Sequence, residues 1–275
     1  MHTFLSLFSK PFPVIGMIHV GALPGTPLYD GKFDRVIDRV RAEAIIYRET
    51  GVDGVLVENM HDIPYIRPKD GLGPEITAAM TRISLAVREI MPTTPCGVQI
   101  LAGCNREALA VAKACRLQFI RAEGFVFGHV ADEGFTDACA GSLLRYRKQI
   151  DADDVFIMAD IKKKHSSHAI TSDVSITETA HAAEFFLADS LIITGSSTGC
   201  SADRQELESL RGKTNLPLII GSGLTLDNFN NYWDLAQGAI VGSYFKVNGH
   251  WRNELCRKRV QKLMERIETR RQQAS

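Results

Sequence analysis

An acidic and a basic side chain lie two positions apart at the end of one apolar segment. Phe156, Met158, Asp160 and Lys162 alternate along it, and they share one face because successive side chains of a β-strand point to opposite sides. If that face lines the interior of the fold, Asp160 and Lys162 emerge together where the strand ends. A carboxylate beside an ammonium group suits proton transfer next to a developing negative charge. We therefore predict that both are catalytic residues.

The basic run continues with Lys163, Lys164 and His165. Consecutive lysines usually lie on a solvated surface, so we expect Lys163 and Lys164 to face water. His165 is a candidate for the polar lining of the site.

Polar side chains also end other apolar segments: His19, Glu58, Asn59, Arg121 and Glu123. His19 and Glu58 are predicted to be catalytic, whereas the other three are predicted to line the interior. Gln99, an isolated polar residue within a segment, could form hydrogen bonds in the same interior. A structural alternative stays open, in which Arg121 forms a buried pair with a glutamate and His19 packs at the rim.

Four of the candidates could together bind a divalent metal ion: His19, Glu58, Asp160 and His165. They follow different segments, so their linear spacing does not test a shared site. The cofactor is therefore left open, with a divalent metal as one alternative.

Two glycine–serine turns, Gly221-Ser222-Gly223 and Gly242-Ser243, follow the last two apolar segments. Glycine lets backbone N–H groups approach an anion and serine adds a hydroxyl. A following helix, which Asp227 could cap, adds its dipole. Turns at this place match the phosphate position common in (β/α)8 barrels. We predict that they bind phosphate; the alternative is two tight turns without a ligand.

Eight short segments rich in Val, Ile, Leu or Phe could position these residues as parallel strands. They are Val14–His19, Gly54–Asn59, Cys96–Leu101, Gln118–Glu123, Val155–Ile161, Ser190–Thr194, Pro217–Gly221 and Ala239–Gly242. Three long loops, Val20–Phe33, Met60–Gly73 and Gly124–Ala140, follow strand ends and are candidate walls and lids of a site.

Stretches long enough for helices separate the strands: Asp34–Thr50, Pro74–Met91, Asn105–Cys115, Ser142–Ile150, Ser175–Ala188, Arg204–Arg211, Leu226–Leu235 and His250–Arg271. Eight strand–helix units without a linker predict an α/β fold, a single (β/α)8 TIM barrel with a phosphate site at its C-terminal face. The domain is expected to span residues 1–275, with residues 1–12 as an N-terminal extension.

Composition argues against several classes of partner. Lys+Arg and Asp+Glu both number 32, so there is no basic excess of the kind that binds nucleic acid. No apolar run reaches the roughly 20 residues of a membrane-spanning helix. The 6 cysteines are scattered without metal-ligand spacing, which indicates reduced thiols. We expect a cytoplasmic protein, with a mitochondrial location as the alternative, and homo-oligomerisation stays open.

The ordered motifs resemble those of the BtpA/SgcQ family. The stretches that carry the resemblance are Pro13–Gly25, Glu58-Asn59 with Asp62, Ile120–Gly128, Ala159–His165, Thr194-Gly195 and Gly221–Gly223. The resemblance runs from about Pro13 to the final helix and implies a place among ribulose-phosphate-binding barrels, in agreement with the predicted phosphate site.

The resemblance implies no particular reaction. The founding bacterial relative is linked to photosystem I accumulation, and another belongs to a presumed sugar-utilisation gene cluster. Glu123 stands where many relatives have Asn, so a direct ligand role for this position is not carried over. The Asp160–Lys162 pair is similar to the Asp-x-Lys element of the orotidylate decarboxylase group, although it lies on the fifth predicted strand instead of the third.

Two functions compete. The first is an enzyme that acts on a small phosphorylated metabolite, such as a sugar phosphate or nucleotide-like compound, with lyase, isomerase or epimerase chemistry. The alternative is a non-catalytic assembly or stability factor for a protein complex. That alternative predicts an apolar or charged patch away from the barrel mouth.

Overall fold

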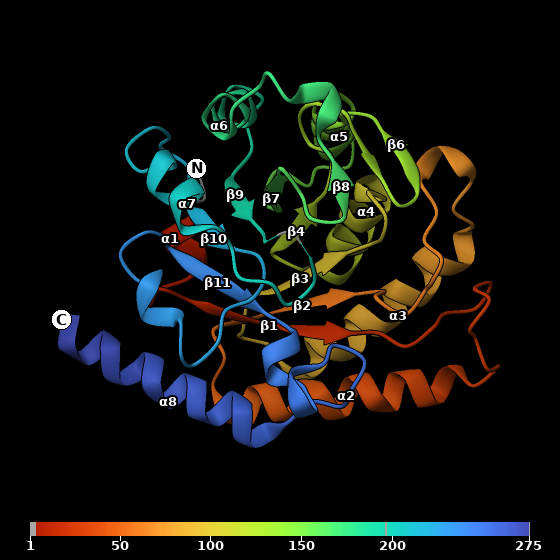
Figure 1. Cartoon of the computed structure of the whole chain (residues 1–275). Coiled ribbons are helices and arrows are strands. Elements are labelled where there is room, and N and C mark those ends of the chain that lie inside the picture. The colour runs from red at the N-terminus through yellow and green to blue at the C-terminus, as the bar shows by residue number, and fades with distance from the viewer. Residues whose placement is uncertain (1–3, 196, 275) are drawn as a thin grey trace.

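The eight predicted strands form a closed parallel barrel. The computed structural model describes residues 4–195 and 197–274, and the strands pair in the order β1-β11-β10-β9-β7-β4-β3-β2. Their bounds are β1 (Val14–His19), β2 (Gly54–Glu58), β3 (Cys96–Gln99), β4 (Phe119–Ala122), β7 (Phe156–Ile161), β9 (Ser190–Ile193), β10 (Leu218–Ile220) and β11 (Gly238–Val241). The predicted fold class is confirmed, and Figure 1 shows the strands surrounded by helices.

Helices follow most of the strands, close to the predicted bounds. They are α2 (Phe33–Thr50), α3 (Pro74–Ile90), α4 (Asn105–Cys115), α5 (Ala140–Gln149), α6 (Ile176–Phe185), α7 (Arg204–Leu210) and α8 (Arg257–Ala274). None of the helices in the described residues is long and apolar enough to cross a membrane.

The helix predicted at Leu226–Leu235 is wrong, because only the 3-10 turn η3 (Phe229–Asn231) forms there. The Asn228 side chain accepts a hydrogen bond from Thr225 N at 2.8 Å and donates one to Gly223 O at 2.9 Å. Such local side-chain bonds offer the backbone an alternative to a helix. Asp227 therefore caps no α-helix.

The last helix begins later than predicted. Two 3-10 turns, η4 (Ser243–Phe245) and η5 (Val247–Gly249), precede the predicted start at His250, and α8 begins only at Arg257. The residues between them fold back on this segment: Leu255 forms an antiparallel β-bridge with Lys246, and Val247 N donates to Glu254 O at 2.8 Å.

The barrel interior is apolar at its N-terminal end. Phe156 and Met158 belong to a buried cluster inside the barrel, so the face predicted from their alternation does line the interior. The expected N-terminal extension takes part: α1 (Phe4–Leu7) places Phe4 and Phe8 in that cluster. The Phe8 and Phe119 ring centroids are 6.1 Å apart. Residues 1–3 of the extension lie outside the described residues.

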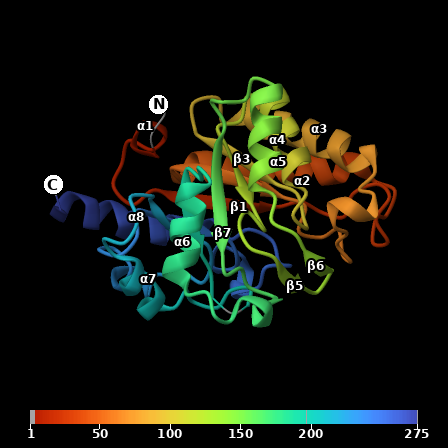
Figure 2. The same ribbon diagram turned by 90° about the horizontal axis from the view of Figure 1, so that it is seen from above.

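A small antiparallel sheet, which the sequence did not predict, is built from two loops at the other end. It contains β5 (His129–Ala131), β6 (Gly134–Thr136) and β8 (Ser166–Ser167), in the order β6-β5-β8. The first two lie within the predicted wall Gly124–Ala140. Figure 2 shows β5 and β6 beyond the arrowhead of β7, with α1 at the opposite end.

Candidate functional site

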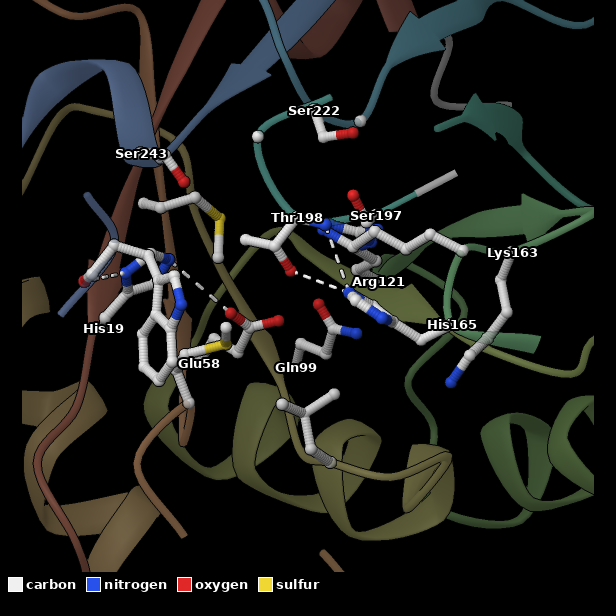
Figure 3. A pocket seen from close by; sticks show the side chains of 18 of the residues that line it. His19, Glu58, Gln99, Arg121, Lys163, His165, Ser197, Thr198, Ser222 and Ser243 are labelled. Carbon is white, nitrogen blue, oxygen red and sulfur yellow. Dashed lines mark hydrogen bonds and ion pairs between the residues drawn. The ribbon is translucent and has the colours of Figure 1, made fainter. Parts of the chain in front are cut away.

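A cavity of about 460 Å³ opens at the C-terminal ends of the barrel strands. Its walls contain most of the polar residues that were predicted from strand ends: His19, Glu58, Arg121, Glu123, His165, Gly221, Ser222, Gly223, Gly242 and Ser243. Figure 3 shows the labelled side chains converging from several strands and loops. The structure thus brings together a predicted set of groups that are as far apart in the sequence as His19 and Ser243.

Lys162 does not belong to this cavity, so its predicted emergence at the mouth is wrong. Its Nζ donates hydrogen bonds to Val174 O at 2.7 Å and Thr171 O at 3.3 Å, on the loop outside the barrel. The cause is the backbone at Lys162, which adopts φ 48°. A left-handed residue directly after β7 ends the alternation of faces, and the side chains that follow turn inward.

Lys163 and Lys164 line the cavity, contrary to the expectation that they face water. Lys163 Nζ lies 3.2 Å from Glu123 Oε1, and both side chains are about nine-tenths buried. Burial alone would raise the pKa of Glu123, but Lys163 and Arg121 outweigh it and hold that pKa below its ordinary value. Burial by itself would lower the pKa of Lys163, yet Glu123 keeps it above its usual value. This pair is therefore charged and internally neutralised.

Arg121 and Asp160 form a bidentate ion pair across neighbouring strands. Arg121 Nε donates to Asp160 Oδ2 at 2.8 Å and its Nη2 donates to Oδ1 at 3.0 Å. Burial disfavours the guanidinium charge, but Asp160, Glu58 and Glu123 outweigh it and raise the pKa of Arg121. Only Arg121 of the pair borders the cavity. The structural alternative expected Arg121 to pair with a glutamate, whereas its partner in the structure is Asp160.

His19 and Glu58 face each other at the base of the cavity. His19 Nδ1 lies 3.2 Å from Trp251 O, and a carbonyl can only accept, so Nδ1 carries the proton in this contact. His19 Nε2 lies 3.7 Å from Glu58 Oε2. Burial, followed by the charge of Lys246, holds the pKa of His19 well below its usual value. The imidazole is thus neutral and presents an unprotonated Nε2 to Glu58.

Glu58 is the buried acid of the cavity that has no close cation among the described residues, whereas Asp132 and Glu133 border the cavity nearer to solvent. Burial raises its pKa above the ordinary value, against the opposing charges of Arg121 and Lys164. A carboxyl whose pKa is raised exchanges protons more readily near neutral pH. His19 and Glu58, which were each predicted to be catalytic, thus lie side by side in the cavity, and both groups are suited to move a proton.

Both glycine–serine turns open into the cavity, at the ends of β10 and β11. The N–H groups of Gly223 and Ser243 donate no backbone hydrogen bond within the described part of the chain. Ser222 Oγ is already occupied, since it donates to Cys200 O at 3.2 Å and accepts from Gly195 N at 3.3 Å. The Ser243 hydroxyl has no partner among the described residues. Of the two serines, Ser243 is therefore the one whose hydroxyl is available to donate a hydrogen bond to a ligand.

Gly242 also sets the space around His19. A Cβ at this position would lie 3.2 Å from His19 Nε2 and 3.3 Å from Met17 Cγ. The glycine thus allows the β11 turn to approach the imidazole closely.

Gln99 has an unsatisfied amide at the cavity wall. The residue is 1% exposed, and its Oε1 has no hydrogen-bond partner among the described residues. An unpaired buried acceptor costs about 1–3 kcal/mol, and it gains a partner if a bound molecule supplies a donor. Its position on β3, next to Glu58 in the β2–β3 register, fits that role.

His165 and Asn59 hold loops in place. His165 Nε2 accepts a hydrogen bond from Thr198 N at 3.1 Å and lies 2.9 Å from Thr198 Oγ1, which anchors the loop after β9 over the cavity. Asn59 does not border the cavity. It donates to Asp62 Oδ2 at 2.8 Å and accepts from Leu101 N at 2.7 Å, so it connects the loops after β2 and β3.

The proposed metal-ligand set is not assembled. Within residues 4–195 and 197–274, no group of three His, Cys, Asp or Glu side chains has a metal-binding arrangement. Asp160 is engaged with Arg121 and His165 with Thr198.

Two further residues contribute to the site and were not predicted. Trp251 reaches His19 through its backbone carbonyl from the segment before α8, and Thr198 comes from the loop after β9. Neither has a motif or follows a strand directly, so no signal in the sequence identifies them.

Known proteins resemble this chain over most of its length. A family model described as the BtpA family matches residues 10–269. A Caenorhabditis elegans protein named as uncharacterised and mitochondrial is 48% identical over 268 residues, covering 95% of this chain and 94% of that protein. The Synechocystis photosystem I biogenesis protein BtpA is 33% identical over 244 residues, covering 88% and 83%.

Solved structures share the fold at low sequence identity. The (S)-3-O-geranylgeranylglyceryl phosphate synthase from Thermoplasma acidophilum, in complex with sn-glycerol-1-phosphate, gives a TM-score of 0.62 at 14% identity, covering 98% of this chain and 100% of that chain. The phosphoribosyl anthranilate isomerase from Thermus thermophilus gives 0.56 at 14% identity, covering 94% and 99%. Both likenesses concern the barrel alone.

Proposed function

The chain belongs to the BtpA family, and from its site we propose that it is an enzyme acting on a small phosphorylated metabolite at the barrel mouth. One observation carries the proposal. Two glycine–serine turns with unused N–H donors border the same cavity as the unpartnered Gln99 amide. A cavity of about 460 Å³ falls within the range that small-molecule sites usually occupy.

The phosphate would bind at the ends of β10 and β11. Gly223 and Ser243 supply N–H groups, the Ser243 hydroxyl adds a donor, and the glycines leave room for the anion. The names of the two solved barrels support this assignment, since one is a glyceryl phosphate synthase with bound sn-glycerol-1-phosphate and the other a phosphoribosyl anthranilate isomerase.

Proton transfer would fall to Glu58 and His19. Glu58 has a raised pKa and His19 presents a neutral Nε2 beside it. Arg121 would stabilise negative charge that develops on the ligand, and Asp160 would hold the guanidinium in position. These roles suit lyase, isomerase or epimerase reactions, in which a proton leaves a carbon next to a carbonyl group.

A binding assay tests the proposal. Inorganic phosphate, D-ribose 5-phosphate and glycerol 1-phosphate are added to the protein, and the melting temperature and the heat of binding are measured. We expect at least one of the three to bind. Gly242→Ala should weaken that binding, because its Cβ would press against His19 Nε2 at 3.2 Å.

The matched control is Gly141→Ala, which adds the same methyl group on α5, remote from the cavity. It should bind like the unaltered protein. If none of the three compounds binds, or if Gly242→Ala binds them as well as Gly141→Ala does, the phosphate assignment is wrong.

A second candidate function is that of an assembly factor, and one surface feature favours it. Phe185, Phe186 and Leu187 are 81%, 45% and 66% exposed. They follow one another at the C-terminal end of α6, which lies at the N-terminal face of the barrel, away from the cavity. The name of the Synechocystis relative, a photosystem I biogenesis protein, points the same way.

Complementation separates the two functions in an organism that depends on the protein. Phe185→Ser combined with Leu187→Ser removes the apolar patch, and Glu58→Gln removes the acid of the cavity. An enzyme should lose function with Glu58→Gln and keep it with the double replacement. The opposite result would favour the assembly factor.

The compartment is proposed from the cysteines. Their scattered positions fit reduced thiols in a reducing compartment, and we propose the cytoplasm with the mitochondrion as the alternative. The name of the Caenorhabditis elegans relative supports that alternative. Imaging of the tagged full-length protein against a mitochondrial marker would decide between them.

A further inference from the structure

Lys164 differs from the two lysines before it. Lys162 donates to two backbone carbonyls, and Lys163 has the Glu123 carboxylate at 3.2 Å. The Lys164 ammonium has neither a hydrogen bond nor a carboxylate within 4 Å among the described residues, although it borders the cavity. Lys164 is half-buried, and its ammonium group borders the cavity without a partner among the described residues, so it is available to a ligand or a reaction.

The backbone of Lys164 is fixed while its amine stays available. Lys164 N donates to Thr194 Oγ1 at 3.1 Å, and Thr194 itself is 5% exposed. This bond ties the loop after β7 to the end of β9. The backbone of Lys164 is therefore held in place, while its side-chain amine forms no hydrogen bond with the described residues.

The charges facing the amine come from four strands and loops. Burial, and then the positive charge of Arg121, hold the pKa of Lys164 below its ordinary value, against the opposing carboxylates of Glu58, Asp160 and Glu123. Two of those carboxylates are already neutralised by their own cations. A larger share of unprotonated amine at neutral pH makes lysine a better nucleophile.

We propose that Lys164 is the nucleophile of the site and forms an imine with a carbonyl group of the phosphorylated ligand. The proposal rests on the proposed function and deepens it. The lone pair of Nζ adds to the carbonyl carbon while one proton passes from the nitrogen to the carbonyl oxygen, which gives a neutral carbinolamine. Loss of that hydroxyl with a second proton releases water and leaves the protonated imine.

Glu58 is the group placed to exchange those protons, because it is the buried carboxyl of the cavity without a close cation and interacts electrostatically with Lys164. The protonated imine then accepts the electron pair that is left when a neighbouring carbon loses a proton or a carbon–carbon bond breaks. Hydrolysis of the imine returns the free amine. No oxidant or reductant is needed at any step.

Gln99 narrows the class of ligand. Its buried Oε1 needs a donor, and a hydroxyl group provides one while leaving the rest of the ligand free. A molecule with a phosphate for the glycine–serine turns, a carbonyl for Lys164 and a hydroxyl for Gln99 is a phosphorylated ketose or aldose.

Reductive trapping tests the imine. The full-length protein is incubated with dihydroxyacetone phosphate, D-ribose 5-phosphate or pyridoxal 5′-phosphate near neutral pH and treated with sodium borohydride, which reduces an imine to a stable amine. Intact-mass and peptide measurements then locate the adduct. We expect one adduct per chain, on Lys164, with at least one of the three probes.

Two variants control the experiment. Lys164→Arg keeps the positive charge and cannot form an imine, so it should lose the adduct while phosphorylated probes still raise its melting temperature. Lys162→Met removes a lysine from the same loop outside the cavity and should keep the adduct on Lys164. Absence of trapping at Lys164 with all three probes, or the same adduct in Lys164→Arg, overturns the proposal.

The two proposals fail in different ways. If the probes raise the melting temperature but no adduct forms on Lys164, the imine is wrong and the phosphate site stands. If dihydroxyacetone is trapped on Lys164 as efficiently as dihydroxyacetone phosphate, the imine stands and the phosphate site is wrong.

Discussion

A buried ion pair anchors the segment that follows the Gly242-Ser243 turn, and its removal should be costly. Lys246 Nζ donates to both carboxylate oxygens of Glu43, each at 2.8 Å. Lys246 is 0% exposed and Glu43 is 4% exposed. The pair connects α2 to the residue directly after η4, so it also holds the turn that we assign to phosphate.

The two single replacements should differ in cost. Breaking a buried pair by removing one partner costs about 3–5 kcal/mol, because a charge stays buried without compensation. After Lys246→Met, Glu43 retains Arg39, whose Nε lies 3.8 Å from Glu43 Oε1, so the lower end of that range applies. After Glu43→Met, Lys246 loses its anion and still faces the positive charge of Arg39, so the upper end applies.

Urea unfolding of the unaltered protein, both single variants and Glu43→Met/Lys246→Met measures these free energies as a double-mutant cycle. We expect the double replacement to cost less than either single one, since an apolar pair buries no charge. If each single replacement lowers the free energy of unfolding by less than about 1 kcal/mol, which is far below the usual range for buried pairs, the reasoning is refuted. A double variant that loses the sum of both single costs would refute it as well.

Three further perturbations test the site and the core. Asp160→Asn removes the carboxylate that holds Arg121 at 2.8 and 3.0 Å; we expect it to lower the free energy of unfolding by about 3–5 kcal/mol, whereas a purely catalytic acid would leave urea unfolding unchanged. Burial, followed by the charge of Lys163, lowers the pKa of His129 from 6.5 to about 4. The unfolded chain therefore binds this proton first, and stability should fall as the pH drops from about 6.5 to about 4. His129→Phe should flatten that dependence in unfolding curves measured across the window, and an unchanged slope would contradict it. Phe8→Ala opens the N-terminal end of the barrel, where Phe8 is 3% exposed, and should lower the free energy of unfolding by about 3–5 kcal/mol; a calorimetric loss near zero would show that residues 4–12 do not contribute to the core.

The sequence predicted elements well where one physical pattern decides them. The strand Val14–His19 and the helix Asn105–Cys115 match the structure in both bounds, because an apolar run between breakers and a regular amphipathic stretch leave little choice. The period-two face of Phe156 and Met158 was also correct, since it follows from strand geometry alone.

The structural predictions that were wrong have local causes, which cannot be recognised from the composition of the sequence. Asn228 bonds to neighbouring backbone groups and prevents the helix expected at Leu226–Leu235. The hairpin of β5 and β6 occupies a loop with no alternating apolar pattern. Trp251 contributes a backbone carbonyl to His19, a contact to which its side-chain identity gives no clue.

The basic run after β7 shows how one backbone angle decides the chemistry of a site. A strand that continued its alternation through Lys162 would present that lysine to the cavity and turn Lys163 away. The left-handed conformation of Lys162, at φ 48°, reverses this order. Lys163 then neutralises Glu123, and Arg121 is neutralised by Asp160.

Because these two ion pairs are complete, few charged groups in the cavity lack a partner. Among the described residues that border it, Asp132 and Glu133 lie nearer to solvent, Glu58 is the buried carboxyl without a close cation, and Lys164 keeps an amine without a close anion. An acid and a base lie in one cavity without a direct partner, although each shifts the pKa of the other. Folding stability does not explain this arrangement, because a direct ion pair would satisfy both groups. A substrate carbonyl between them would use the amine as nucleophile and the carboxyl as proton donor.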